Sequence, residues 1–349
     1  MTRYLDIRDI RRLVQARGIE ETLEQLAAFI RQDFLRWQDF DKCPRLASHS
    51  SVGVIELMPA SDGTHYGFKY VNGHPRNQRH GKLTVMAFGV LAEVATGYPL
   101  LLCDMTLATA MRTAATSALA AKAMARADAR SMAIIGNGCQ SEFQVLAFHR
   151  MLGIKEIRAF DVDPVASAKL RRNLASVSGL RLTLAGSAEE AASGADIVTT
   201  VTADKTHATI LRPGMIEPGM HINAIGGDCP GKTEIDPAIV ERARVVVEYE
   251  AQSRIEGEIQ QMGDDFPVTE LWQVLAGKAP GRRTAEEVTL FDSVGFALED
   301  FSTLRYFYQL ACDESIGREI ELVPELADPR DLFGSLALPA AAVRAETVC

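Results

Sequence analysis

The 349-residue chain contains no uninterrupted apolar stretch of the roughly 18 residues that a transmembrane helix needs. Its first residues, MTRYLDIRDIRRLV, are charged and amphipathic and lack the apolar core of a secretory signal. We therefore expect neither export nor insertion into a membrane, and we expect a cytoplasmic protein.

The cysteines and histidines form no recognisable framework. None of the six cysteines belongs to a C-x-x-C pair, and the seven histidines form no H-x₃-H or HExxH pattern. Scattered cysteines are typical of a reduced cytosolic protein and not of a disulfide-stapled one. We expect no metal site, because the ligand spacing of a zinc centre is absent.

Positive charge is also scarce. The net charge is −9, and no dense run of lysine and arginine occurs. This argues against nucleic acid as a partner and leaves a small molecule as the expected ligand. A length of 349 residues makes two domains the natural expectation.

The first third of the chain combines helices with β-rich segments. Residues 5–37 have helical spacing with a break near Gly18, and short β-rich runs at 53–58, 65–71 and 83–92 are separated by turn signals. The last of these runs is expected to form a hairpin with YPLLLCDM, turning at residues 95–97. Residues 107–127, LATAMRTAATSALAAKAMARA, predict a long helix of small residues that another backbone can approach closely.

From residue 130 onward, apolar strand-like runs alternate with helical segments, which is the pattern of a parallel sheet with helices on both faces. The expected strands are 131–135, 156–160, 181–184, 196–201, 220–225, 244–248 and 288–292. The fold class is therefore α/β: a Rossmann-type doubly wound parallel sheet domain plus an α+β domain with a mostly antiparallel sheet.

The most informative motif follows the first of these strands. Gly136 and Gly138 form a G-x-G turn before a helical stretch, and Asp161 lies at the end of the next strand, 25 residues after Gly136. Such a turn brings backbone N–H groups to a pyrophosphate at a helix N-terminus. A carboxylate at the second strand end binds the ribose hydroxyls and repels a 2′-phosphate, so the motif predicts NAD and favours it over NADP.

Other strand ends offer polar groups to the same crevice. Residues 199–203 are rich in threonine, which fits a ligand-lining segment or an ordinary strand end. Asp228 follows two glycines after the next strand, where it either acts in catalysis or caps a simple turn. Ser293 and Val294 follow the last strand and are expected to point toward the same place.

Four residues in the first third stay undecided from pattern alone. Lys69 alternates with aromatic residues in HYGFKYVNG, which favours a solvent-facing lysine on a one-sided sheet. Arg112 interrupts the small-residue helix and needs a partner, for which a ligand carboxylate or phosphate is suited. Arg45 and Glu56 fit ordinary surface positions equally well.

Longer strings carry a resemblance across residues 4–333. They are SHSSVGVIELMP, FKYVNGHP, TVMAFGVLAEV, RTAATS, IGNGCQSEFQ, TTVTADK, GGDCPGKTE, EYEAQSRIEGEIQQ and FDSVGFALED. With these strings the chain resembles the ornithine cyclodeaminase/μ-crystallin family, and its cyclodeaminase branch in particular.

The resemblance implies conversion of L-ornithine to L-proline and ammonia, with NAD⁺ taking up a hydride and returning it in each turnover. It implies catalytic roles for Asp228 and Glu56, and it places Arg45, Lys69 and Arg112 around the substrate carboxylate with Val294 beside the aliphatic chain. The cofactor contacts that it implies are Thr84, Arg112, Gly136, Gly138, Cys139, Gln140, Asp161, Thr202, Asn223, Ala224, Ile225, Lys232 and Ser293. Cys139 departs from the alanine or other small residue expected there, with little effect because the backbone meets the phosphate.

Three alternatives remain open at this point. The first is an NAD-dependent amino-acid dehydrogenase or ketimine reductase, and the second is a lysine cyclodeaminase, since one methylene changes binding by only about 1–3 kcal/mol. The third is a binding or storage protein. The resemblance also suggests a homodimer built through the first domain's sheet. We expect residues 1–125 with 312–349 to form the substrate-binding and oligomerisation domain, and residues 126–311 to form the NAD-binding domain.

Overall fold

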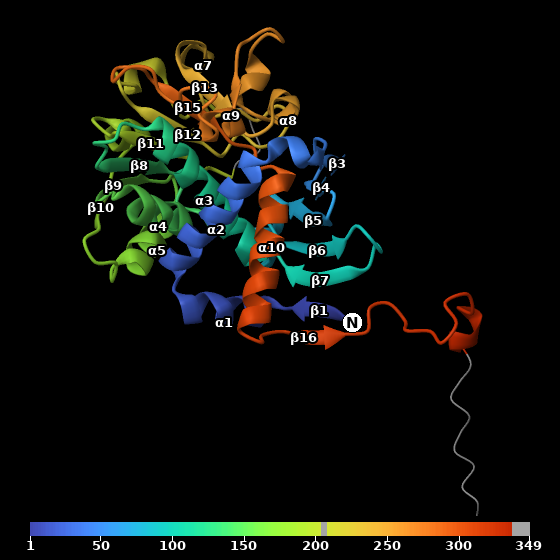
Figure 1. Cartoon of the computed structure of the whole chain (residues 1–349). Coiled ribbons are helices and arrows are strands. Elements are labelled where there is room, and N and C mark those ends of the chain that lie inside the picture. The colour runs from blue at the N-terminus through green and yellow to red at the C-terminus, as the bar shows by residue number, and fades with distance from the viewer. Residues whose placement is uncertain (204–207, 337–349) are drawn as a thin grey trace, which may run out of the picture.

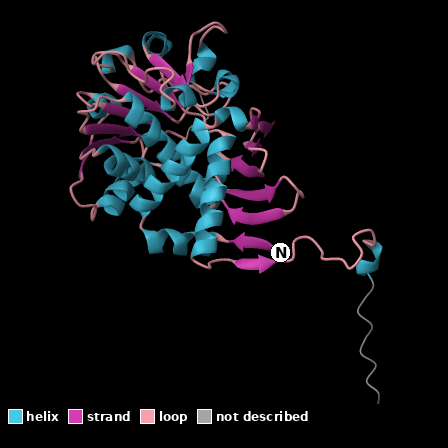
Figure 2. Cartoon of the chain, in the orientation of Figure 1, coloured by secondary structure: helices cyan, strands magenta, loops and turns pink. Residues whose placement is uncertain are grey.

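The computed structural model describes residues 1–203 and 208–336. Two eight-stranded sheets are joined by a layer of helices, and the chain leaves the body after residue 320 as an extended arm (Figure 1). Figure 2 shows the helices, in cyan, between the magenta strands of the two sheets. Among the described residues, no helix has the length and apolar character needed to cross a membrane.

The first sheet, called sheet A, has the order β16-β1-β7-β6-β5-β4-β2, with β3 also paired to β4. Every pairing is antiparallel except that of β1 with β7, so the prediction of a mostly antiparallel sheet is confirmed. Its strands are β1 (Thr2–Leu5), β2 (Asp41–Lys42), β3 (Leu46–His49), β4 (Val54–Ser61), β5 (His65–Gly73), β6 (Ala87–Glu93), β7 (Pro99–Asp104) and β16 (Arg318–Ile320).

The second sheet, called sheet B, has the order β10-β9-β8-β11-β12-β15-β13-β14, and all of its pairings are parallel. The order reverses beside β8, as in a doubly wound dinucleotide-binding sheet. Its strands are β8 (Ser131–Ile135), β9 (Glu156–Phe160), β10 (Arg181–Leu184), β11 (Ile197–Thr200), β12 (His221–Ala224), β13 (Arg244–Val247), β14 (Thr269–Glu270) and β15 (Thr289–Asp292). The predicted fold class is confirmed.

Local sequence explains where the first helices begin and end. Asp6 accepts hydrogen bonds from the backbone N–H groups of Arg8 and Asp9 and starts α1 (Ile7–Arg17). Gly18, at φ 89°, separates α1 from α2 (Ile19–Leu35), which is the predicted break. The other α-helices are α3 (Thr106–Met124), α4 (Ser141–Leu152), α5 (Pro164–Leu174), α6 (Ala188–Ala192), α7 (Pro237–Arg242), α8 (Glu250–Glu256), α9 (Leu271–Leu275) and α10 (Ala297–Asp313).

Short 3₁₀ turns complete the described part: η1 (Trp37–Asp39), η2 (Pro75–His80), η3 (Pro213–Met215), η4 (Glu258–Gln261) and η5 (Phe333–Leu336).

Two long helices connect the sheets. The small-residue helix α3 is almost entirely buried and packs against α2 and α4, as its composition predicts. Helix α10 follows the last long strand of sheet B but packs on α2 and on β4, β5 and β6 of sheet A. The predicted domain boundaries stay a prediction, and the tail at 337–349 lies outside the described residues.

Candidate active site

A cavity of about 640 Å³ lies between the two sheets. Sheet A contributes residues of β4 and β5, sheet B contributes the loops after β8, β11, β12 and β15, and α3 closes one side. The predicted site residues that line it are Arg45, Glu56, Lys69, Thr84, Arg112, Gly138, Cys139, Gln140, Thr202, Ile225, Asp228, Lys232, Ser293 and Val294. Segments far apart in the sequence therefore meet at one place.

The turn between β8 and α4 has the properties of an anion site. Gly136 has φ 101°, and a Cβ there would lie 2.6 Å from the carbonyl oxygen of Val201, so only glycine fits. Gly138 has open space around its Cβ position. No side chain caps the first turn of α4, whose N-cap residue is Gln140. Its N–H groups are therefore available to a phosphate.

Asp161 lies directly beside this turn. Its Oδ2 accepts a hydrogen bond from the backbone N–H of Asn137 at 2.6 Å, and its Oδ1 accepts one from Asp163 at 2.8 Å. The carboxylate that the motif assigns to a ribose thus also fixes the glycine turn to the end of β9.

Arg45 is held by groups from three segments: β4, α8 and the turn after β15. Its Nη1 lies 3.0 Å from Glu56 Oε2, its Nε lies 3.0 Å from Glu256 Oε2, and its Nη2 donates to the carbonyl oxygens of Val294 and Gly295. Burial acts to lower the pKa of Arg45, but the charges of Glu56 and Glu256 outweigh it and raise that pKa above its ordinary value. Arg45 is therefore a permanent cation.

Lys69 lies on the buried face of β5 and is 1% exposed, so the interpretation as a solvent-facing lysine is wrong. The alternation does place Lys69 and the aromatic residues on opposite faces, but α10 covers the lysine face and leaves the aromatic face half open. Lys69 Nζ lies 2.9 and 2.8 Å from the two carboxylate oxygens of Asp300 on α10. Burial and the nearby Arg112 lower the pKa of Lys69 to about 8.

Arg112 uses the same carboxylate. Its Nε donates to Asp300 Oδ1 at 2.9 Å, and its Nη1 donates to Glu299 Oε2 at 2.7 Å. Its Nη2 makes no hydrogen bond to another described residue. The N–H groups of Nη2 are therefore left for a ligand. Burial, together with Glu248 and Asp300, raises the pKa of Glu299 to about 8, although Arg112 opposes the shift.

The turn after β15 brings backbone against Arg112. A Cβ on Gly295 would lie 2.4 Å from Arg112 Nη1, and Gly295 has φ 74°. Buried Glu248 holds this turn, because it accepts hydrogen bonds from Ser293 Oγ and from the backbone N–H groups of Val294 and Gly295. Ser293 and Val294 thereby reach the cavity, as predicted from their place after the strand.

Asp228 stands at the opening of the cavity, with half of its side chain exposed. Its Oδ1 lies 3.4 Å from Nζ of Lys232, whose ammonium also donates to the carbonyl oxygen of Thr202 at 2.9 Å. Burial acts to lower the pKa of Lys232, but Asp228 and Glu234 raise it above its ordinary value. A carboxylate next to a permanent ammonium and open to a ligand is placed to exchange protons.

Four predicted cofactor residues do not line the cavity. Gly136 and Asp161 shape the turn from behind, whereas Asn223 and Ala224 are buried in β12. The amide Nδ2 of Asn223 donates to Thr199 Oγ1 at 3.3 Å, inside the sheet. The side chain of Asn223 therefore supports the site and does not face it.

Four acidic residues of the site were missed at the level of sequence: Glu248, Glu256, Glu299 and Asp300. Each is nearly or fully buried. The available signal was their position, because acidic side chains in or beside apolar runs such as VVVEYE and GFALED need a cationic partner. Among residues 1–203 and 208–336, no group of three histidine, cysteine or acidic side chains is arranged to hold a metal ion.

Comparison with known proteins extends this description. The model of the ornithine cyclodeaminase/μ-crystallin family matches residues 9–315. Ornithine cyclodeaminase of Brucella suis is 56% identical over 333 residues, which cover 95% of this chain and 93% of that protein. Alanine dehydrogenase of Archaeoglobus fulgidus is 34% identical over 80% of this chain and 87% of its own length.

Solved structures agree in fold. A lysine cyclodeaminase, described as recognising L-lysine, L-ornithine and L-2,4-diaminobutyric acid, superimposes with a TM-score of 0.87 at 29% identity, covering 95% of this chain and 98% of its own. An archaeal alanine dehydrogenase dimer with bound NAD gives a TM-score of 0.85 at 30% identity, with coverage of 92% and 99%. The chain belongs to the ornithine cyclodeaminase/μ-crystallin family.

Proposed function

We propose that this protein is an enzyme that converts L-ornithine to L-proline and ammonium, with NAD⁺ as a cofactor that is restored in each turnover. The observation that carries the proposal is the joint placement of three buried cations, two carboxylates and a phosphate-binding turn around one cavity. The 56% identity to the ornithine cyclodeaminase of Brucella suis over nearly the whole chain supports this substrate.

The residues around the β8–α4 turn fit a dinucleotide. The backbone of Gly138, Cys139 and Gln140 and the uncapped N-terminus of α4 would hold the pyrophosphate, with Asp161 at the ribose. Thr84, Thr202, Ile225, Lys232 and Ser293 line the remaining path. When bound there, the cofactor would supply a hydride acceptor in its oxidised form and a hydride donor in its reduced form.

The chain's own residues bind and orient the substrate. Lys69 and Arg112 line the cavity and bind the substrate carboxylate. Arg45 donates to Glu56 and to the carbonyl oxygen of Val294, and it thereby fixes the wall that these two residues form. Holding Cα in one orientation supplies much of the rate. Asp228 accepts a proton from an ammonium group and later delivers one to the departing ammonia, and Glu56 is the second carboxylate beside the reacting amines.

The competing function is a one-way hydride transfer, either oxidation of an amino acid or reduction of a cyclic imine. Delta(1)-pyrroline-2-carboxylate reductase of Bacillus cereus is 31% identical to this chain, and an amino-acid dehydrogenase or ketimine reductase would use the same cations for the same carboxylate. The two classes differ in whether the cofactor ends in its starting redox state.

The test is a reaction of the pure protein with L-ornithine and a sub-stoichiometric amount of NAD⁺. Proline and ammonium in equal amounts, far above the NAD⁺ supplied and without lasting absorbance at 340 nm, establish the cyclodeaminase. NADH that accumulates until NAD⁺ is exhausted establishes a dehydrogenase instead. The same assay with L-lysine measures how strictly the cavity selects chain length.

Replacing Asp161 by alanine is expected to erode the preference for NAD over NADP. The change removes the carboxylate that repels a 2′-phosphate, and it also frees the backbone of Asn137. Dissociation constants for both cofactors, measured by fluorescence titration, check this. Equal affinities in the unmodified protein would contradict it.

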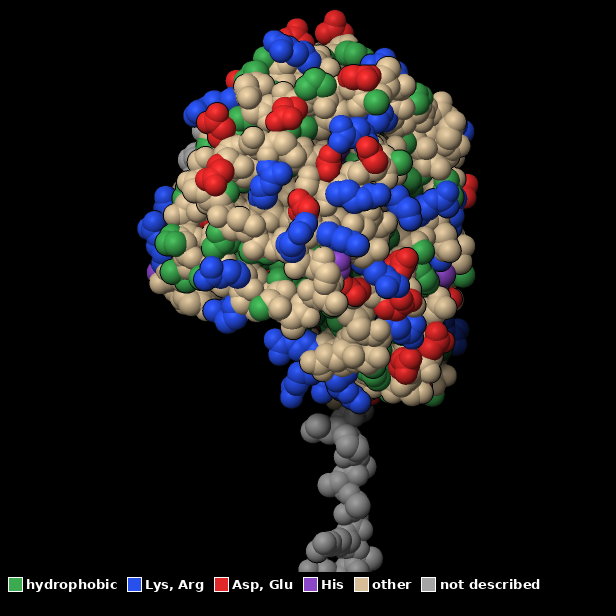
Figure 3. Space-filling model, turned by 90° about the vertical axis from the view of Figure 1, so that its left-hand side faces the viewer, with side chains coloured by type: hydrophobic (Ala, Val, Ile, Leu, Met, Phe, Trp, Pro, Cys, Tyr) green, Lys and Arg blue, Asp and Glu red, His purple; other side chains and the backbone are tan. Residues whose placement is uncertain are grey.

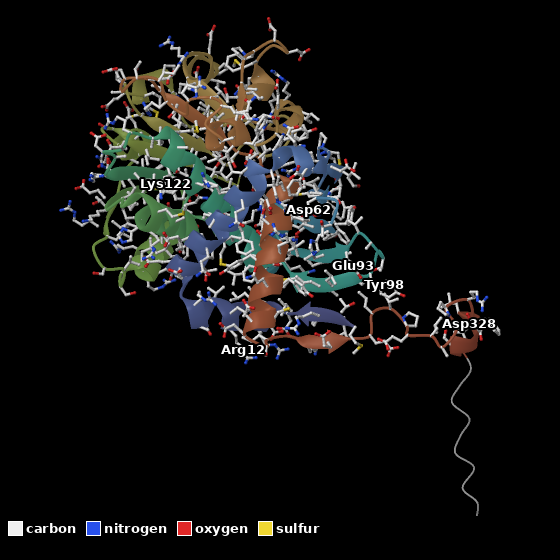
Figure 4. The ribbon with its side chains drawn as sticks, viewed as in Figure 1. Arg12, Asp62, Glu93, Tyr98, Lys122 and Asp328 are labelled. Atoms are coloured by element: carbon white, nitrogen blue, oxygen red, sulfur yellow. The ribbon has the colours of Figure 1, made fainter. Side chains whose placement is uncertain are left out.

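We propose further that the protein is a homodimer built through the outer face of sheet A. On that face Ile55, Leu57, Tyr66 and Phe88 are between 36% and 42% exposed, and such an apolar surface is typical of an interface. Figure 4 marks Glu93 and Tyr98 at the β6–β7 turn of this sheet. In contrast, the face in Figure 3 mixes basic and acidic side chains with scattered apolar ones.

Leu57→Glu is expected to give a monomer in light scattering coupled to size exclusion, because it places a charge in the proposed interface. Val165→Glu is the matched control, since Val165 is 73% exposed on α5 and away from sheet A. An unchanged mass for Leu57→Glu would overturn the proposed interface. The domain boundaries at 125/126 and 311/312 and the cytoplasmic location remain predictions.

A further inference from the structure

One carboxylate lies between Lys69 and Arg112, two of the cations that line the cavity. Asp300 belongs to the first turn of α10 and is 1% exposed. Its Oδ1 accepts hydrogen bonds from Lys69 Nζ and from Arg112 Nε, both at 2.9 Å, and its Oδ2 lies 2.8 Å from Lys69 Nζ.

Asp300 itself does not line the cavity, whereas Lys69 and Arg112 do. It therefore lies behind the cations as seen from a bound ligand. The two cations come from β5 and α3, so a carboxylate on α10 fixes three elements relative to one another. Lys69 and Arg112 repel each other, and a shared anion is what permits both to face one small ligand group.

We propose that Asp300 is a positioning residue that holds Lys69 and Arg112 in the orientation that binds the substrate carboxylate. This inference rests on the proposed amino-acid substrate, and it adds a residue to which the sequence assigned no role. Glu299 assists from the same helix by holding Nη1 of Arg112, and Gly295 provides the space that this guanidinium occupies.

The charges around Lys69 give the proposal a pH signature. Arg112 from α3 and Arg45 from the segment before β3 lower its pKa, Asp300 from α10 raises it, and the Glu299 carboxyl lies next to Asp300. Lys69 binds a carboxylate as the ammonium, so affinity for substrate falls as the pH rises through its pKa of about 8. Removing the charge of Asp300 moves that fall to lower pH.

The decisive variant is Asp300→Asn, which keeps the shape and removes the charge. We expect KM for L-ornithine to rise about tenfold or more with a smaller change in kcat, because displaced cations bind the substrate carboxylate less well in the ground state and in the transition state alike. The dissociation constant for NAD⁺ should change less than KM, because Arg112 is an expected cofactor contact whereas Lys69 is not. The high-pH limb of kcat/KM should shift to lower pH, and the substrate's own titration cancels in this comparison.

Asp33→Asn is the matched control. Asp33 is a fully buried carboxylate on α2 that bridges Arg36 and Arg305. It also accepts a hydrogen bond from Ser302, which lies on α10 as Asp300 does, but it does not line the cavity. It should lower the melting temperature and leave KM and the pH profile unchanged. If Asp300→Asn behaves like Asp33→Asn, the role of Asp300 is structural only and the proposal is wrong.

Asp300→Glu covers the case in which the asparagine variant does not fold. It keeps the charge but displaces the carboxylate, so we expect a raised KM with an unshifted high-pH limb. If the KM of this variant equals that of the unmodified protein, the proposal is wrong. If the unmodified protein makes no proline at all, the proposed function is wrong. This result is distinct from a failure of the proposed role of Asp300, in which the unmodified protein makes proline and the variants do not behave as expected.

Discussion

Asp228→Asn is expected to abolish proline formation while leaving the affinity for NAD⁺ close to that of the unmodified protein. Asparagine keeps the size of the side chain and its contact distance to Lys232, but it takes up no proton. General acid–base catalysis contributes about 10²–10⁴-fold to a rate, and kcat should fall by that factor. Because half of the Asp228 side chain is exposed, the stability of the fold should change little.

Steady-state kinetics with L-ornithine and a fluorescence titration with NAD⁺ measure the two parts of this prediction. Asp128→Asn is the control for loss of one negative charge, since the Asp128 side chain is 80% exposed and lies away from the cavity. Undiminished turnover by Asp228→Asn would remove Asp228 from its catalytic role and leave Glu56 as the candidate.

Gly295→Ala should lower kcat/KM for L-ornithine about 100-fold, the size of effect that a misplacement of about 1 Å produces. The new Cβ would lie 2.4 Å from Arg112 Nη1, and the backbone has φ 74°. Neither the Arg112 side chain nor the Gly295 backbone can move away easily to relieve this contact. Arg112 is fixed by Glu299 and Asp300, while the Gly295 backbone is bound by Glu248, Arg45 and Gln252.

Gly97→Ala is the control that separates the effect of backbone strain on kcat/KM from the effect of the contact with Arg112. Gly97 has φ 76°, but nothing lies within 4 Å of its Cβ position in the β6–β7 turn. Both variants should lose about 1–2 kcal/mol of stability from the left-handed backbone. Only Gly295→Ala should lose activity, and equal activities would show that the close approach to Arg112 has no role in binding.

Much of sheet B follows from local pattern. Its central strands β8, β11, β12 and β15 are runs of four or five buried residues. The predicted strands at 131–135, 156–160 and 181–184 match the observed bounds. The strands that escaped prediction are short, such as β16 (Arg318–Ile320), which pairs with β1 at the opposite end of the sequence. A three-residue strand has too few positions to show a period of two.

The prediction for Lys69 failed for a different reason. Alternation in β5 shows that Lys69 and its aromatic neighbours occupy opposite faces, but it does not show which face is covered. Which face is covered depends on α10, which follows more than 200 residues later in the sequence and carries Asp300. Hydrophobicity alone favoured burying the aromatic face, and the buried ion pair reversed that choice.

The amino-acid sequence by itself determined the parallel sheet and the glycine turn with Asp161. These features depend on periodicity and on backbone requirements that neighbouring residues express. Only the tertiary structure decided how the cations are partnered and which of them keep free donors. Ion pairs such as Asp300 with Lys69 and Arg112 join elements 188 to 231 residues apart, and no local pattern encodes a contact at that separation.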